Sequence, residues 1–249
     1  MKKKSVLLFI LVILAFAALA QDSVATTISR NRYANIDFGV GYMHTDLNNI
    51  NGFLSTYGYK PMSEDIITLS IAPSFFVSRF VFRGEFTWQF RAVRPQPENF
   101  MSAFGGRHVA VSIGYLLIDK PGYRFYPYVG ISSFASHLTV REKTSAFTVD
   151  DLVNNQQQGF QLVYSNASLD VGFQFDKLIS LQNGRWDCPQ SNRYMTLGLR
   201  VGYLFGPTVK GRFNGQIVEG APAYSPNGPY IKLVMGFSTK MRDLKWKNE

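Results

Sequence analysis

The stretch "RYMTLGLRVGYLFGP" (193–207) alternates strictly between two kinds of residue. Odd positions from 195 to 205 carry Met, Leu, Leu, Val, Tyr and Phe, whereas the even positions between them carry Thr, Gly, Arg, Gly and Leu. A period of two over this length predicts a β-strand with two unlike faces. A soluble barrel would turn the apolar face inward, and a membrane barrel would turn it outward to lipid.

Seven further segments alternate in the same way. They are 33–43, 65–76, 79–93, 107–117, 123–140, 162–175 and 230–241. Several match the 9–11 residues that a tilted strand needs to cross a bilayer. The segment 123–140 is ambiguous in parity, and Pro127 within it predicts a bulge or an irregular start.

The connections alternate in length. Short links join segments two and three and segments four and five, whereas the other links, such as 141–159 and 206–228, are long. Short periplasmic turns and long extracellular loops are typical of outer-membrane barrels. The connection 176–192 is an exception, because it falls where a short turn is expected. We therefore predict an all-β fold: an eight-stranded antiparallel up-and-down transmembrane β-barrel over 33–241, with long extracellular loops.

The chain begins with a predicted targeting segment. Three lysines precede the apolar run "VLLFILVILAFAALA" (6–20), which ends in small residues. This pattern predicts a cleaved secretory signal peptide at 1–20. We expect a periplasmic linker at 21–32, a periplasmic basic tail at 242–249, and an integral location in the outer membrane of a Gram-negative envelope.

Composition narrows the classes of partner and site. The formal charge of +9 includes the signal lysines, and the other basic residues form no stripe, so nucleic acid is not an expected partner. Cys188 is the single cysteine, which excludes an internal disulfide and a multi-cysteine zinc site. We expect no cofactor and no metal, outer-membrane lipids around the barrel, and a monomer.

The minor parity of the segments carries charges of both signs. We predict that these charges form a network in the lumen, because the bulky apolar parity would overfill an eight-stranded interior. The expected members are Asp37, Arg83, Glu85, Arg91, Asp170, Arg200 and Lys232. Asp170 and Arg200 fall at similar depth on neighbouring strands, so we expect them to face each other.

Four aromatic residues on the apolar parity lie toward strand ends, where interfacial girdles form. These are Tyr42, Trp88, Tyr115 and Tyr203. We expect them at the membrane–water interfaces.

Candidate chemistry is sparse. His44, His108 and His137 map near the extracellular rim, with Asp46 and Ser136 nearby, which keeps open a lipid-modifying enzyme. Ser136 and His137 are adjacent, however, and so point to opposite faces of a strand. The histidines share no spacing typical of metal sites. We therefore expect no catalytic residues.

Strands such as "IDFGVGYM", "VFRGEFTWQF" and "LGLRVGYLF" make the chain similar to small outer-membrane barrels. It resembles the PorT-like group of the Bacteroidetes and, more distantly, OmpA-like and OmpX-like barrels. The resemblance implies a non-catalytic barrel that acts through its loops or through envelope partners, including a secretion accessory. The alternatives are a lipid-modifying outer-membrane enzyme, a soluble lipocalin-like binding barrel and a narrow pore.

Overall fold

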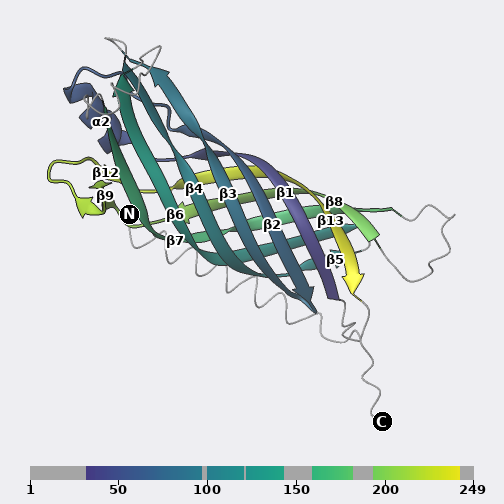
Figure 1. The fold of residues 1–249 in the computed structure, drawn as a ribbon. Helices are drawn as coiled ribbons and strands as arrows, with labels where there is room; N and C mark the ends of the chain where they lie inside the picture. Colours follow the sequence, from purple (N-terminus) through teal and green to yellow (C-terminus); the bar gives the residue numbers. More distant parts are fainter. Residues whose placement is uncertain (1–31, 97–99, 121, 143–158, 182–192, 242–249) are drawn as a thin grey trace, which may run out of the picture.

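The computed structural model describes residues 32–96, 100–120, 122–142, 159–181 and 193–241 (Figure 1). The predicted signal peptide, most of the predicted linker, the basic tail and Cys188 lie outside these ranges. Arg32, which we assigned to the linker, is already the first residue of a strand.

Eight long strands form one closed antiparallel barrel (Figure 1). They are β1 (Arg32–His44), β2 (Asp65–Val77), β3 (Phe80–Pro95), β4 (Phe100–Tyr115), β6 (Tyr123–Glu142), β7 (Gly159–Ser180), β8 (Arg193–Phe205) and β13 (Gly228–Met241). Each strand pairs with its neighbour in sequence, and β13 closes the barrel on β1. The predicted fold class is confirmed.

The remaining elements are short. At the end of the barrel that carries the longer connections lie the helix α2 (Asn48–Thr56) and the two-residue strands β9 (Val209–Lys210) and β12 (Ala223–Tyr224), which pair with each other. β10 (Arg212–Phe213) and β11 (Gln216–Ile217) form a small hairpin beside β7. β5 (Ile118–Lys120) pairs with β6 in the turn at the opposite end. Since long loops are extracellular in such barrels, we call the α2 end extracellular and the β5 end periplasmic.

The opening stretch shows which face is which. Leu197, Leu199, Val201, Tyr203 and Phe205 are all exposed on the outside of β8. The side chains that alternate with them point inward, and that of Arg200 is 1% exposed. An exposed apolar outer wall around a buried charged interior is the arrangement of a membrane barrel. The same polarity excludes the soluble lipocalin-like alternative.

Glycine on the inner face leaves room for large side chains. A Cβ on Gly202 would lie 2.5 Å from the hydroxyl oxygen of Tyr128 and 2.7 Å from the ring of Tyr230. Gly172 faces the same Tyr128 hydroxyl. Both glycines therefore make space for the tyrosines that contact Arg200 and Asp170.

Two connections differ from expectation because strands run further than their alternation. β4 begins at Phe100, so only residues 96–99 separate it from β3, where we expected a long loop. β7 continues to Ser180, so residues 176–180 of the unusually long connection are strand. Within β3 the register shifts between Gln89 and Ala92.

A bulge or an irregular start was predicted at Pro127, and no bulge is present there. β6 keeps one register with β7 throughout, including at Pro127. On its other side β6 pairs with β5 up to Phe125 and with β4 from Tyr128 onward. Pro127 falls in the gap between these two ladders, where no backbone donor is required.

The ambiguous parity of this segment has a different cause: the apolar face changes sides along β6. Below Ser132 the apolar side chains, Val129 and Ile131, point outward and are exposed. Above it the buried apolar side chains Phe134, Leu138 and Val140 point inward, and the outward positions are Ser133, Ala135, His137 and Thr139. β7 repeats the change, with Leu169 exposed outside and Leu162 and Tyr164 buried inside. The strands show no break in register where the apolar side chains change faces. We therefore infer that the environment outside the wall changes there from lipid to water.

Candidate functional site

A cluster of ionised side chains fills the middle of the barrel. We call it the charged layer and define it as Asp37, Arg83, Glu85, Asp170, Arg200 and Lys232, all at most 5% exposed. They come from β1, β3, β7, β8 and β13, so the contacts cross the lumen.

Glu85 is the centre of the charged layer. Its carboxylate accepts hydrogen bonds from the Lys232 ammonium and, at 3.3 Å, from Arg83 Nε. Arg200 Nε lies 3.6 Å from the same carboxylate. Thr87 donates a further hydrogen bond to Glu85 at 3.0 Å. One carboxylate therefore holds three cations that reach it from three strands.

Asp37 and Asp170 complete the pairing at the edges of the charged layer. Arg83 also donates to Asp37. Arg200 Nη2 lies 3.4 Å from Asp170 Oδ2, although Asp170 is opposite Leu204 in the ladder, so this contact is diagonal. Burying an ion costs several kcal/mol unless it is paired, and these contacts supply the pairing.

Arg200 is held by neutral groups as well. Its guanidinium carbon lies 3.5 Å from the centre of the Tyr128 ring, and Nη1 donates to Gln174 at 3.2 Å. Tyr230 donates to Asp170 at 2.7 Å. These contacts fix the orientation of the Arg200 guanidinium group, which bridges Glu85 and Asp170.

The seventh predicted member, Arg91, lies where the register of β3 shifts, and its side chain is not among those that the structure describes.

Two buried charged residues were not predicted from the sequence. Arg124 is opposite Asp176 in the β6–β7 ladder, and both point inward. Asp176 falls on the same alternation as Asp170 and Gln174, two residues further along, so this alternation could have identified it as inward-facing. Arg124 could not be assigned to a face, because the apolar side chains change faces along β6.

With these two, the buried charges balance. Among the described residues, and apart from His108, the buried cations are Arg83, Arg124, Arg200 and Lys232, and the buried anions are Asp37, Glu85, Asp170 and Asp176. Four charges of each sign give a neutral interior, which lowers the cost of enclosing them.

An apolar cluster, the apolar cap, closes the interior above the charged layer. It joins Ile50 and Leu54 of α2 and Tyr224 of β12 to inward side chains of the wall. The buried wall residues are Met43, Ile66, Phe104, Phe134, Leu138, Val140, Leu162, Tyr164, Leu204 and Tyr230, and Leu47 and Met62 add to them from the first loop.

Tyr224 is the hub of the apolar cap. Its ring centre lies 5.1 Å from that of Phe104, 5.5 Å from Tyr164 and 5.7 Å from Phe134. Its hydroxyl group is 3.1 Å from the Thr45 hydroxyl oxygen. A residue of the last extracellular loop thereby ties the first loop to the barrel wall.

A second apolar group narrows the periplasmic end. Phe76, Val81, Leu116 and Tyr126 are buried together. Beside them the guanidinium carbon of Arg124 lies 4.2 Å from the centre of the Tyr33 ring and 4.6 Å from that of Phe76. The interior is therefore packed at both ends, with the charged layer between.

The four predicted interfacial aromatics all lie on the outer face. Tyr42 and Tyr203 lie two residues from the extracellular ends of β1 and β8, and Tyr115 is the last residue of β4. Trp88 lies in the middle of β3, because that strand continues to Pro95 with Phe90 and Val93 also exposed on its outer face. It is opposite Arg107 in the ladder, where the outward face of β4 turns polar.

The histidines occupy three unrelated environments. His44 Nδ1 is 2.9 Å from Asp65 at the extracellular rim, and His137 lies outside β6 with Gln161 Nε2 3.1 Å from its Nδ1. His108 was expected at the rim but points into the barrel and is 6% exposed. Ser136 is buried on the inner face, away from His137. In the described ranges no group of three His, Cys, Asp or Glu side chains is arranged to hold a metal ion.

No helix within the described part of the chain is long and apolar enough to span a membrane. The wall of strands is apolar outside and closed upon itself, so every backbone group of the span can be paired within the protein. This is the condition that the hydrocarbon core of a bilayer imposes.

Comparisons with other proteins show similar architecture at low sequence identity. No family model and no curated protein matches the chain. Neisserial surface protein A has a TM-score of 0.40 and 11% identity, over 84% of this chain and 97% of that one. The attachment invasion locus protein Ail of Yersinia pestis has a TM-score of 0.40 and 9% identity, over 85% and 99%. The N-terminal barrel of Pseudomonas aeruginosa OprF has a TM-score of 0.34 and 12% identity, over 85% and 98%. The closed barrel with an exposed apolar outer face and a buried charged interior identifies this chain as an integral outer-membrane protein.

Proposed function

We propose that this protein is a non-catalytic and non-conducting barrel that acts through its extracellular end, by contact with another protein of the envelope. The finer role that we propose, an accessory of protein secretion, rests on the resemblance to the PorT-like barrels alone. The observation that carries the broader proposal is the filled interior, in which a neutral charged layer lies beneath the apolar cap.

The packing of the interior supports a closed barrel. Arg200 and Lys232 each contact Glu85 across the lumen. An ion entering the lumen would have to break these ion pairs, and no bulk water is there to solvate the separated charges. Above them Tyr224 and α2 are packed against the wall. Conduction would need both the charged layer and the apolar cap to rearrange.

The extracellular wall supports contact with a partner. β6 and β7 are the longest strands, with 20 and 22 residues, and they continue well past the apolar outer face. Their outward positions there include Thr139, Gln161 and Ser165. A rigid polar sheet above a membrane offers a partner a surface that needs little ordering on binding.

Planar bilayers test the closed barrel. We expect no stepwise conductance from the purified protein at voltages where a reference porin conducts. Glu85→Gln is the matched variant, because it removes the central anion while keeping the shape of the side chain. Regular conductance steps from the unmodified protein would overturn the non-conducting part of the proposal.

Cross-linking in cells tests the contact surface. A photoreactive amino acid at Thr139 should give one discrete adduct with an envelope protein, whereas the same probe at the outward apolar position Ile131 should give lipid adducts. Thr139→Arg should then fail to restore the phenotype of a deletion strain, with the barrel still folded by heat-modifiable migration. Full rescue by Thr139→Arg, without any protein adduct at this position, would contradict action through this wall. If His137→Ala failed to rescue the deletion strain and also changed its lipid profile, the lipid-modifying enzyme would be favoured instead.

A further inference from the structure

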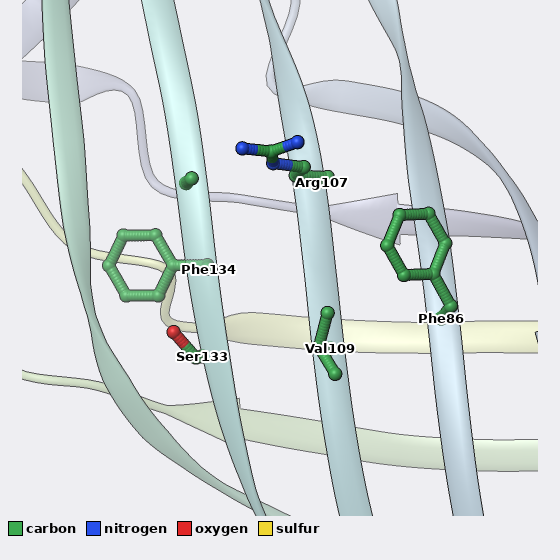
Figure 2. A pocket seen from close by; sticks show the side chains of 6 residues that line it. Phe86, Arg107, Val109, Ser133 and Phe134 are labelled. Carbon is green, nitrogen blue, oxygen red and sulfur yellow. The ribbon is translucent and has the colours of Figure 1, made fainter.

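A pocket of about 300 Å³ opens on the outside of the barrel wall, across β3, β4 and β6 (Figure 2). Its lining is Phe86, Arg107, Val109, Ser133, Phe134 and Ala135. Figure 2 shows Arg107 and Val109 on β4, between Phe86 on β3 and Ser133 and Phe134 on β6. The pocket lies apart from the charged layer, and Phe134, whose side chain points inward into the apolar cap, forms part of its floor.

The register explains why the wall is hollow here. Val109 is opposite Phe86 on one side and Ser133 on the other. One row further out, Arg107 is opposite Trp88 and Ala135. On the next strand Ala167 is opposite Ser133, and Ser165 is opposite Ala135. A patch of small outward side chains on β6 and β7 therefore lies beside the bulky residues of β3 and β4.

The pocket lies where the outer face of β6 and β7 stops being apolar, whereas on β3 Phe90 and Val93 stay exposed further out. The row just below it, toward the periplasm, consists of Val111, Ile131 and Leu169, which are 64%, 65% and 44% exposed. Above that row the outward face of β6 becomes polar while its inner face becomes apolar. The pocket thus spans the boundary between acyl chains and headgroups in the outer leaflet, and Trp88 beside it is the kind of residue that occupies this depth.

Arg107 is exposed, and within the described part of the chain no hydrogen bond or ion pair is formed by its side chain. An arginine on the lipid side of a barrel is costly unless its guanidinium meets water or an anion at the interface. Its planar fork matches the geometry of a phosphate group, to which it can donate two hydrogen bonds. Directly below it, Phe86 and Val109 offer an apolar surface.

We propose that this pocket binds a phosphorylated lipid of the outer leaflet, with the phosphate on Arg107 and an acyl chain along Phe86, Val109 and the small residues of β6. The arrangement pairs one cation with an apolar hollow directly beneath it in the membrane, which is the charge and polarity pattern of such a lipid. The small side chains at Ser133 and Ala135 let the chain approach the wall. This inference is independent of any protein partner at the extracellular end.

The test uses two lipids that differ only in the phosphate. The purified barrel in uncharged detergent is titrated with phosphatidic acid and with diacylglycerol of the same acyl chains, and bound lipid is counted by native mass spectrometry. We expect phosphatidic acid to bind about tenfold more tightly, the difference typical of one hydrogen-bonded contact to a charged group. Equal binding of the two lipids would overturn the proposal.

Three variants locate the site. Arg107→Gln should remove the preference for phosphatidic acid, whereas Arg141→Gln, an exposed arginine further along the same outward face, should retain it. Ser133→Phe fills the hollow without changing charge, and should weaken both lipids to a similar degree. All variants are checked for folding by heat-modifiable migration. A retained preference in Arg107→Gln, or an equal loss in Arg141→Gln, would refute the assignment.

A competition experiment separates a lipid site from a simple phosphate site. Inorganic phosphate at millimolar concentration should leave bound phosphatidic acid in place, because it cannot replace the contacts of the acyl chain. Complete displacement would show that Arg107 binds free phosphate and that the apolar hollow has no part in binding.

Discussion

The charged layer and the apolar cap fill the same barrel with opposite chemistry. Glu85 and its three cations occupy the part of the interior that the apolar outer wall surrounds. Tyr224, α2 and their neighbours occupy the part that rises above that wall. Both parts are closely packed, yet ion pairs fill the first and aliphatic and aromatic side chains fill the second.

The difference shows how the medium outside a wall determines what lies inside it. Where lipid surrounds the strands, the apolar parity is drawn outward, and the inner parity receives the polar residues. Where water surrounds them, apolar residues are driven inward by the hydrophobic effect, as in a soluble protein. On β6 the change falls between Ile131 and Phe134, and the pocket at Arg107 lies at the same level.

Removing the central anion should have the largest effect. Glu85→Gln leaves Arg83, Arg200 and Lys232 around a neutral group, and breaking a buried pair typically costs about 3–5 kcal/mol. Reversible urea unfolding in lipid vesicles should show this loss of stability. Glu64→Gln, at the exposed rim, is the matched control and should change the midpoint little. A loss below about 1 kcal/mol for Glu85→Gln would mean that the charged layer is not paired as described.

Truncating the hub of the apolar cap should have a smaller and more local effect. Tyr224→Ala removes contacts with Phe104, Phe134 and Tyr164, at a cost of about 3 kcal/mol. Because the apolar cap lies above the membrane wall, we expect faster hydrogen exchange in α2 and unchanged exchange in the lower barrel. Tyr57→Ala, a truncation of an exposed tyrosine at the end of α2, should leave both unchanged. Equally fast exchange throughout the Tyr224→Ala barrel would show that the two parts unfold as one unit.

Restoring neutrality should recover much of the loss in the charged layer. Glu85→Gln combined with Lys232→Met removes one charge of each sign, and Arg83 and Arg200 keep Asp37 and Asp170. Replacing a buried pair by neutral groups is often close to neutral, so we expect the double variant to lie within about 1–2 kcal/mol of the original barrel. Glu85→Gln with Lys177→Met, which removes an exposed cation instead, should recover nothing. An unimproved first double variant would show that geometry, and not charge balance, limits stability.

The smallest effect is expected at the extracellular rim, beyond the apolar wall. Hydrogen bonds with His44 and Tyr42 hold the pKa of Asp65 below its ordinary value. Because the pKa is lowered on folding, the contribution to stability is present above the ordinary pKa of aspartate, about 3.9, and is lost as the pH falls through the lower folded value. His44→Ala should raise the pKa of Asp65 toward the ordinary value in an NMR titration of the carboxylate. An unchanged titration would show that His44 does not hold Asp65 in solution.

The eight strands could be predicted because lipid outside and polar groups inside produce a clean period of two. The stretch 193–207 shows this, since each outward residue is apolar and Arg200 falls on the inner parity. The inward orientation of Asp37, Glu85 and Lys232 follows from the same pattern. The pattern fails on β6 and β7 above the membrane, which is why the parity near Phe134 was ambiguous. It also fails on the first residues of β4, so the start of that strand at Phe100 was missed.

Contacts within the barrel needed the closed structure. Asp170 and Arg200 could be assigned to neighbouring strands, but the diagonal contact and the shared use of Glu85 depend on the register and on the small diameter of the lumen. Arg124 was not assigned, because the change of sides further along β6 made the parity of the whole segment ambiguous. Asp176 was not assigned, because it lies where β7 continues beyond the alternating segment.

By itself, the sequence determined the strand number, the strand order and the two faces of the wall, because these depend on local alternation and on the lengths of connections. Only the tertiary structure decided that α2 and Tyr224 seal the extracellular end, that Glu85 binds three cations, and that a pocket opens beside Arg107. These features join residues that are far apart in the chain. Their contacts depend on how the closure of the barrel and the register of its strands bring these residues together. No local pattern in the sequence determines how close they come.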